Sequence, residues 1–383
     1  MTRPAPQLLS LEDKLDAVKE DLHEEYRASH GYPWIVGFSG GKDSTLVAQL
    51  AIEMLLELPP SGRTRPVHIV ANDTLVEAPL VAQHLDRMLD RIRRGSEALR
   101  LPVTVVKTSP KADQTFWVNL IGRGYPSPSR TFRWCTDRMK IQPTSHYIRS
   151  QVASNGQVIL LLGVRREESS TRAVSVNKYS NGERLNPHNN LQGCMVYRPI
   201  VDLTTDEVWQ VLLQRRPPWG GSHRELVTLY RNGQGGECPL VLDKNDAPSC
   251  GTSSSRFGCW TCTVVVKDRS MEGFIEAGHA NLEPLLDLRD WLAAIRQDPS
   301  KRMAHRRSGR VTHLADGSLI PGPFTLAARR EILDRLLDTQ AQVGEPLISN
   351  QEIETIERIW AEDAAFGLKA AIPTKDGELE SAQ

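Results

Sequence analysis

The sequence predicts an α/β fold class: a doubly wound parallel sheet, followed by a cysteine-rich region and a helical C-terminal region. Three observations predict it. Short runs of Val, Ile and Leu alternate with helix-length segments, and the first intervals between the runs have βαβ length. A Gly-Gly turn separates the first run from the helix that follows it. Beyond residue 215 the alternation stops, and cysteines appear in a stretch rich in Gly and Ser.

The first half of the chain supplies the sheet. Residues 11–29 have the apolar spacing of an amphipathic helix, and strands are expected at residues 34–38, 67–71, 103–106 and 158–162. Continuous apolar runs indicate strands buried on both faces, with helices on both sides of the sheet. Ligands of such sheets bind at the carboxyl ends of the strands. Residues 39–45, 72–77 and 163–172 fall there.

The second half changes character after a capping box at residues 204–207, which predicts the start of a helix. Residues 216–262 show little periodicity, so a metal or a function is needed to order them. Helices are expected again at residues 284–296, 323–340 and 350–362. The predicted organisation is an N-terminal helix (1–30), an α/β domain (31–215), a cysteine-rich region (216–270), a helical region (271–370) and a disordered tail (371–383).

Composition excludes some classes of function. Of the 383 residues, 25% are charged and 39% hydrophobic, and Lys+Arg and Asp+Glu both number 47. A nucleic-acid surface must therefore be a local patch. No apolar run has membrane-spanning length and residues 1–20 carry no signal-peptide core, so a cytoplasmic protein without a membrane partner is expected. In that compartment the six cysteines suit metal ligands or reactive thiols better than disulfides.

Residues 39–45 are the most informative segment. Glycines let the backbone approach a phosphate closely, and a helix N-terminus offers free N–H donors and a positive dipole end. The spacing does not fit a Walker A loop. A plain Gly-Gly turn is the alternative, but strand, turn, lysine and helix all agree. Phosphate binding is therefore assigned to Ser39, Gly40, Gly41, Lys42, Ser44 and Thr45.

The cysteines form a second signal. Cys250, Cys259 and Cys262 lie within thirteen residues, and Cys135 at the expected start of a helix is a candidate fourth ligand. Four thiolates suit structural zinc or an iron–sulfur cluster, and spacing alone does not separate the two. Cys238 could be a reactive thiol or sulfur carrier, or could replace Cys135 as a ligand. Cys194 is expected to pack as a small apolar side chain.

Residues 39–45 resemble the PP-loop of ATP pyrophosphatases, which cut ATP to AMP and pyrophosphate. Further segments at residues 72–77, 133–143, 163–172 and 199–209 accompany it. Over residues 30–265 the set resembles the phosphoadenosine phosphosulfate reductase superfamily of adenine nucleotide α-hydrolases. Within it, the intact loop and the trio of cysteines behind Cys135 resemble the DndC and SspD families of DNA phosphorothioation sulfurtransferases.

That resemblance implies cofactors and roles. It implies an adenine nucleotide α-hydrolase-like sheet that uses ATP, and a [4Fe-4S] cluster on Cys135, Cys250, Cys259 and Cys262. Asp43 is the expected Mg²⁺ ligand. Asp73 is either a second carboxylate at the nucleotide or a helix N-cap. Arg165 and Arg172 would hold the α-phosphate or the acceptor phosphate. The residues expected to act in catalysis are Lys42, Asp43, Arg165 and Cys238.

The implied reaction activates a DNA backbone phosphate by adenylylation, releases pyrophosphate and replaces a non-bridging oxygen by sulfur. Implied partners are DNA, a cysteine desulfurase as sulfur donor and other phosphorothioation proteins of the same gene cluster; a homo-oligomer is left open. The alternatives are a sulfonucleotide reductase, a tRNA-thiolating enzyme and a non-catalytic nucleotide sensor. The intact loop, the single Cys135 where such reductases carry adjacent cysteines, and the lack of any cysteine after Cys262 oppose the reductase.

Two basic groups are candidate DNA contacts, with a solvated charged loop as the alternative. Surface ion pairing is favoured instead for Arg166, Glu167 and Glu168. The first basic group contains Arg296, Lys301, Arg302, His305, Arg306, Arg307 and Arg310, and the second contains Arg91, Arg93 and Arg94.

Overall fold

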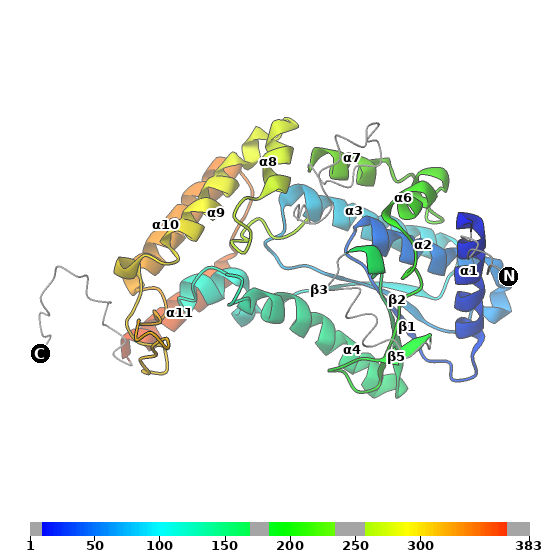
Figure 1. Cartoon of the computed structure of the whole chain (residues 1–383), viewed down its shortest axis with the longest axis horizontal. Helices are drawn as coiled ribbons and strands as arrows, with labels where there is room; N and C mark the ends of the chain where they lie inside the picture. Colours follow the sequence, from blue (N-terminus) through cyan, green and yellow to red (C-terminus); the bar gives the residue numbers. More distant parts are fainter. Residues whose placement is uncertain (1–9, 169–183, 234–256, 366–383) are drawn as a thin grey trace, which may run out of the picture. The chain divides into compact units, whose positions relative to one another are not determined.

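The structure is a computed structural model that describes residues 10–168, 184–233 and 257–365 (Figure 1). One six-stranded sheet has the order β3-β2-β1-β4-β6-β5. Neighbouring strands are parallel except β5 and β6, which pair antiparallel. The strands are β1 (Trp34–Gly37), β2 (Val67–Asn72), β3 (Val103–Thr108), β4 (Val158–Leu161), β5 (Leu185–Pro187) and β6 (Cys194–Tyr197). The predicted α/β class and mainly parallel sheet are thereby confirmed, as are the four expected strands.

Helices cover both faces of this sheet. Figure 1 shows α2 (Lys42–Glu57) and α3 (Pro79–Ala98) on one face and α4 (Gln142–Asn155) on the other. Trp34, Ile35 and Val36 of β1 are fully buried, and all four residues of β4 are buried as well. The apolar runs that predicted these strands are therefore the centre of the core.

The order of the strands creates a binding position. The chain runs outward from β1 to β2 and β3, then returns to place β4 on the other side of β1. Ligands of doubly wound sheets bind outside the carboxyl ends of the strands at this switch point. The loops after Gly37 and Leu161 lie there, because β1 and β4 are parallel neighbours.

Two of the remaining helices begin at capping boxes that the sequence displays. Ser10 and Asp13 form a capping box at α1, and Thr204 and Glu207 form the predicted one at α6. The three helices expected near the C-terminus are confirmed as α9, α10 and α11. The bounds are α1 (Leu11–Arg27), α6 (Thr205–Gln214), α7 (Arg224–Asn232), α8 (Arg269–Glu276), α9 (Glu283–Ile295), α10 (Leu326–Val343) and α11 (Asn350–Ala365).

The chain divides into two compact units that are discontinuous along the sequence. The first contains the sheet and takes residues 1–72, 79–108 and 144–255, and the second takes residues 73–78, 109–143 and 256–383. In the second unit, buried Arg329 of α10 donates to the Gly122 carbonyl oxygen (2.6 Å) and pairs with Asp363 of α11 (2.8 Å). The boundaries expected from the sequence are continuous and stay a prediction.

No helix in the described ranges combines the length and the apolar character that a membrane span requires.

Candidate nucleotide site and cysteine centre

The loop between β1 and α2 has the backbone that its glycines predict. Gly40 has φ +73°, which is the left-handed region, and Gly41 is the extended N-cap of α2 without a side-chain cap. His84 of α3 is buried, and its Nε2 lies 3.2 Å from the Gly40 carbonyl oxygen. Burial lowers the pKa of His84, so the neutral ring donates to that carbonyl. His84 of α3 thus stabilises the turn. The N-terminus of α2 lies at the switch point, and no side chain of its N-cap residue occupies the free N–H groups there.

Lys42 lies at the first position of α2 and is 3% exposed. Its ammonium lies 3.2 Å from Asp43 Oδ2 and 5.6 Å from the centre of the Tyr230 ring. The Lys42 backbone N–H donates to the Tyr230 hydroxyl (3.2 Å), which comes from α7. Thr45 Oγ1 is buried and has no hydrogen-bond partner within the described ranges. Nearly buried cationic and hydroxyl groups thus gather around the helix N-terminus, as an anion site requires.

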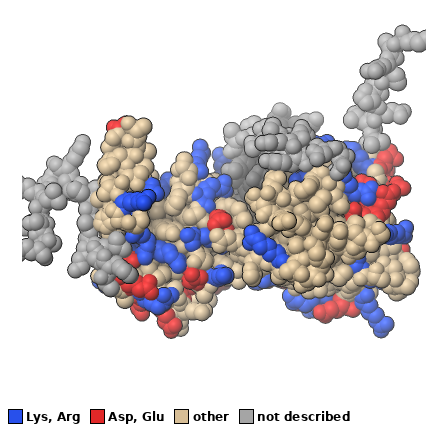
Figure 2. Space-filling view, turned by 90° about the horizontal axis from the view of Figure 1, so that it is seen from below, with Lys and Arg blue, Asp and Glu red and all other residues tan. Residues whose placement is uncertain are grey.

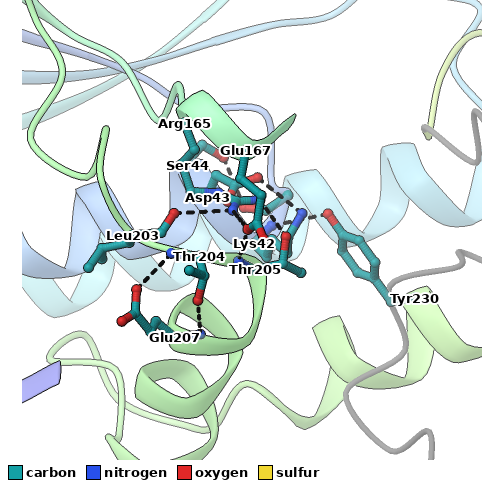
Figure 3. Close-up of polar contacts among 11 residues, drawn as sticks. Lys42, Asp43, Ser44, Arg165, Glu167, Leu203, Thr204, Thr205, Glu207 and Tyr230 are labelled. Carbon is teal, nitrogen blue, oxygen red and sulfur yellow. Dashed lines mark hydrogen bonds and ion pairs between the residues drawn. The ribbon is translucent and has the colours of Figure 1, made fainter. Parts of the chain in front are cut away.

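Arg165 fixes Asp43 (Figure 3). Its fully buried guanidinium donates from Nε to Asp43 Oδ1 (2.6 Å) and from Nη2 to Thr205 Oγ1 (3.0 Å). Nη1 lies 3.2 Å from Glu167 Oε2, which also accepts the Thr205 N–H (2.6 Å). Arg165 therefore links the phosphate loop to the start of α6. The described contacts make Arg165 a positioning residue for Asp43, and its expected contact with the α-phosphate or the acceptor phosphate stays a prediction.

The loop after β4 touches the phosphate loop through its backbone. A Cβ on Gly163 would lie 2.8 Å from the Asp43 carbonyl carbon and 2.9 Å from the Ser44 nitrogen. Only glycine permits this approach without displacing the loop. This contact explains why position 163, two residues before Arg165, is a glycine.

Two further residues were expected to bind the nucleotide, Arg172 and Asp73. Arg172 lies outside the described residues. Asp73 belongs to the second compact unit, where its Oδ1 accepts the Leu75 N–H at 2.8 Å. Asp73 does not cap a helix, because α3 begins only at Pro79. Its role as a second carboxylate stays a prediction.

Three of the four expected cluster ligands are described, and all three belong to the second unit: Cys135, Cys259 and Cys262. The Cys262 N–H donates to the Cys259 carbonyl oxygen (3.0 Å), which closes a tight turn. Buried Trp260 inside this turn packs on Trp117, with ring centres 5.8 Å apart. Arg289 of α9 donates from Nε to the Cys262 carbonyl oxygen (3.0 Å). The C-x-x-C turn is therefore fixed on both sides.

The three thiols share an electrostatic environment. Burial raises the pKa of Cys259 to about 12, although Lys140 lowers it, and burial and the nearby Cys262 raise the pKa of Cys135. The Cys259 thiolate and the neighbouring Glu77 carboxylate raise the pKa of Lys140 despite its desolvation. The positive charge of Lys140 would thus compensate the negative charge of these thiolates. This compensation favours ligation by thiolates at this place.

The described residues do not complete a metal site by themselves. Within residues 10–168, 184–233 and 257–365, no three His, Cys, Asp or Glu side chains are grouped closely enough for one metal ion. Cys250, the fourth predicted ligand, and Cys238, the predicted sulfur carrier, lie outside the described residues. Cys194 is 2% exposed in β6, and burial raises its pKa to about 11, so its packing role is confirmed.

In the basic group at residues 296–310, three arginines are held by contacts within the chain, and Arg302 is too buried to contact DNA; a DNA contact by the rest of the group stays a prediction. Arg302 is 4% exposed and donates from Nε to the Gly322 carbonyl oxygen (2.8 Å). Arg296 donates to the Pro128 carbonyl oxygen (2.8 Å), and Arg307 pairs with Asp363. Arg306 and Arg310 are exposed. Arg296 and Arg302 thus donate to backbone carbonyl groups, and the spacing of basic residues in the sequence does not indicate these contacts.

Sequence reasoning missed two residues of the nucleotide site, His84 and Tyr230. They lie 44 and 188 residues from their loop partners, so no local sequence signal indicates them. The ion pairing expected for Arg166 and Glu167 is found: Arg166 pairs with Asp202, and Glu167, whose side chain is 53% exposed, pairs with Arg165.

A Gly-Gly loop at the switch point, with a buried lysine and a fixed aspartate on the next helix, defines a PP-loop nucleotide enzyme. The profile of the phosphoadenosine phosphosulfate reductase domain matches residues 33–265, and the chain belongs to this family. Over 187 residues, 49% of the chain, it is 24% identical to the uncharacterised protein MJ0066 of Methanocaldococcus jannaschii. The chain spans only 32% of that relative's length.

Solved structures show more distant similarity. The phosphoadenylyl-sulfate reductase of Candida auris is 16% identical with a TM-score of 0.32, covering 54% of this chain and 88% of that one. The NAD⁺ synthetase of Burkholderia pseudomallei is 12% identical with a TM-score of 0.38, covering 88% and 92%. The U34-tRNA thiolase NcsA of Methanococcus maripaludis, with its [4Fe-4S] cluster, is 13% identical with a TM-score of 0.31, covering 75% and 79%. Similarity at this level assigns no substrate.

Replacing Tyr230 with Phe is expected to lower the Kd for ATP severalfold. The hydroxyl uses an N–H of the first turn of α2, a donor that a bound phosphate needs. Phe keeps the ring near Lys42 but frees that donor. Titration calorimetry with a non-hydrolysable ATP analogue measures the change. Tyr147→Phe, whose hydroxyl contacts His68 on β2, is the control. A weaker affinity in Tyr230→Phe would mean that the hydroxyl contacts the nucleotide.

Proposed function

We propose that this protein is an ATP-dependent sulfurtransferase of DNA phosphorothioation, of the DndC or SspD kind. The observation that carries the proposal is the fixed position of Asp43 beside the phosphate lysine. A carboxylate next to bound phosphates suits a magnesium–pyrophosphate leaving group. Cleavage of ATP needs such a group, whereas reduction of a sulfonucleotide does not.

The residues present fit ATP and Mg²⁺. The glycine turn, the uncapped start of α2, Lys42 and the unpartnered Thr45 hydroxyl suit the phosphates. Asp43 would hold Mg²⁺, whose positive charge would neutralise the developing charge on pyrophosphate. Arg165 sets the orientation of that carboxylate.

We assign an iron–sulfur cluster to the thiol centre rather than a single zinc ion. The assignment rests on the resemblance of the four cysteine positions to the DndC and SspD families. Cys135, Cys259 and Cys262 also lie close enough to influence one another's charge. Cys135, Cys259 and Cys262, with Cys250, would hold the cluster. When bound, it would supply sulfur to the reaction or order the surrounding loop.

The reaction follows from the poor leaving ability of a phosphodiester oxygen. A non-bridging DNA oxygen attacks the α-phosphorus of ATP, and the bond to pyrophosphate breaks. A sulfur nucleophile then attacks the adenylylated DNA phosphorus, and AMP leaves with the former DNA oxygen. The protein holds the reacting groups in line and stabilises the departing charge at the start of α2. A cysteine desulfurase would supply the sulfur, and other proteins of the modification system would select the DNA site.

The deciding experiment is digestion of host DNA, with the gene present and deleted, followed by mass spectrometry of nuclease-resistant dinucleotides. Phosphorothioate dinucleotides that appear only with the gene support the proposal and identify the modified sequence. Sulfur-free DNA in both strains, with the other modification genes expressed, would contradict it. The sulfur of tRNA and the formation of sulfite are then the next quantities to measure.

Replacing Cys259 with Ser is expected to lower the iron and acid-labile sulfide of anaerobically purified protein severalfold, and to remove its visible absorption. A serine oxygen is a poorer ligand for iron than thiolate. Cys194→Ala is the matched control, since that thiol packs in the sheet and should leave the iron content unchanged. One zinc and no iron in the wild-type protein would contradict the cluster assignment.

A further inference from the structure

We propose that an arginine-lined groove on the first unit binds the phosphodiester backbone of duplex DNA. This inference rests on the proposed function, because it names the surface that holds the DNA substrate. The groove has a volume of about 1050 Å³ and lies among α3, α6, α7 and the loop that joins α6 to α7. Its arginines are Arg91, Arg94, Arg215, Arg216, Arg224 and Arg231.

The charge of the groove departs from that of the whole chain. The net charge is zero, and on the face shown in Figure 2 basic and acidic side chains are interspersed. Among the residues that line the groove, six are arginines and Glu225 is the acidic one. Arg91 pairs with Glu225 at 2.6 Å, Arg94 pairs with Asp90 and Arg215 pairs with Glu53 at 3.5 Å, so the local excess of positive charge comes from the other three arginines. Such an excess attracts a polyanion that the rest of the surface would not.

Three of the arginines are available for a ligand. Arg216, Arg224 and Arg231 are exposed, and the described ranges offer none of them a hydrogen-bond or ion-pair partner. Arg224 and Arg231 lie at the two ends of α7, and Arg216 lies in the preceding loop. Separated, exposed guanidinium groups suit a chain of phosphates better than one small anion.

At the floor of the groove, α3 and the loop between α6 and α7 are closely packed. Gly95 of α3 meets the loop so closely that a Cβ there would lie 2.6 Å from Trp219 Cα. Trp219 is 6% exposed and contacts His223 edge-on, with ring centres 6.2 Å apart. His223 Nε2 lies 2.7 Å from Gln49 Oε1 of α2, the helix that begins at the phosphate loop. Burial lowers the pKa of His223 to about 4, so the positive charge comes from the arginines.

The same elements connect the groove to the nucleotide site. Tyr230, which contacts the Lys42 N–H, precedes Arg231 on α7, and Arg165 contacts Thr205 at the start of α6. Figure 1 shows α3, α6 and α7 on the same side of the sheet. A DNA backbone in the groove would therefore lie on the helices that hold the ATP loop. This arrangement suits a reaction in which a DNA phosphate attacks ATP.

The test is fluorescence anisotropy of the full chain with labelled duplex DNA at several salt concentrations. The variant Arg216→Gln/Arg224→Gln/Arg231→Gln is expected to bind about 10- to 100-fold more weakly. Its slope of log K against log salt should fall by about 1 per arginine. The control Arg27→Gln/Arg100→Gln/Arg149→Gln removes three exposed arginines outside the groove and outside both basic groups, and should bind like wild type. The KM for ATP should be unchanged in both.

Each other outcome has a distinct meaning. Equal DNA affinity in wild type and the groove variant overturns the groove and leaves the proposed function standing. Tighter binding of tRNA than of duplex DNA, lost in the groove variant, overturns DNA as the ligand. A raised KM for ATP with unchanged DNA affinity would make the groove part of the nucleotide site, and overturns the inference as well. A wild-type protein with no measurable affinity for DNA contradicts the proposed function itself.

Discussion

Replacing Lys42 with Ala is expected to slow pyrophosphate release by about 10²–10³-fold, the cost of removing one preorganised group that stabilises developing charge. Phosphorothioates should disappear from host DNA in the same variant. The Lys42 ammonium is almost fully buried at the start of α2, where the helix N–H donors converge. Charge on the departing pyrophosphate is therefore stabilised in a site of low dielectric.

The two readouts of this variant are released pyrophosphate and resistant dinucleotides from a complemented deletion strain. Lys19→Ala is the matched control, because Lys19 pairs with Glu57 at 2.7 Å away from the loop. It should keep both activities. DNA that is still modified by Lys42→Ala would show that the loop does not catalyse the reaction, and would favour a subunit that only senses the nucleotide.

The sheet and the phosphate loop could be predicted because their signals are local. The run from Trp34 and the glycines at 40 and 41 lie within one strand–turn–helix unit, so propensity, turn chemistry and helix start agree there. The box at Thr204 and Glu207 is equally local. Strands β5 and β6 were missed, since neither Leu185–Pro187 nor Cys194–Tyr197 is part of a continuous run of Val, Ile and Leu.

The rest of the site depends on contacts distant in sequence. Arg165 and Asp43 are 122 residues apart, so a single sequence does not reveal that they pair. In the sequence, an arginine such as Arg165 suggests a contact with phosphate. Only the structure shows that its guanidinium donates to the nearly buried Asp43 carboxylate. The same holds for Arg302, whose partner is a backbone carbonyl twenty residues away. The partners of buried charged residues are therefore found only in the structure.

The cysteine centre shows an intermediate case. The C-x-x-C spacing is local, and the tight turn between Cys259 and Cys262 is found. The residues that contact this turn are distant in sequence and follow β2. The Glu77 and Cys259 backbones form an isolated antiparallel bridge, and Thr74 Oγ1 lies 3.2 Å from Cys259 Sγ. The segment after β2 therefore belongs to the unit of the cysteines. Its resemblance to a nucleotide motif gave no indication of this.

Replacing Arg165 with Met is expected to lower the free energy of unfolding by about 1.5–3 kcal/mol, because the Asp43 carboxylate loses one of its two cationic partners in a nearly buried position and keeps only Lys42. Pyrophosphate release should fall as well, since Asp43 is no longer oriented. The neighbouring Arg166→Met is the control. Arg166 is 45% exposed and pairs with Asp202 on the surface, so a change of about 0–1 kcal/mol is expected.

A double-mutant cycle separates positioning from general stabilisation. Urea unfolding of Asp43→Asn, Arg165→Met and the double variant should give a coupling energy of about 0.5–3 kcal/mol, because the two side chains contact directly. Activity gives the second readout. If Arg165 acts through Asp43, the variant Arg165→Met should need a higher magnesium concentration for half-maximal pyrophosphate release, and it should add little to the effect of Asp43→Asn. A higher KM for ATP at saturating magnesium, with no coupling to Asp43, would instead mean that Arg165 contacts the nucleotide phosphates.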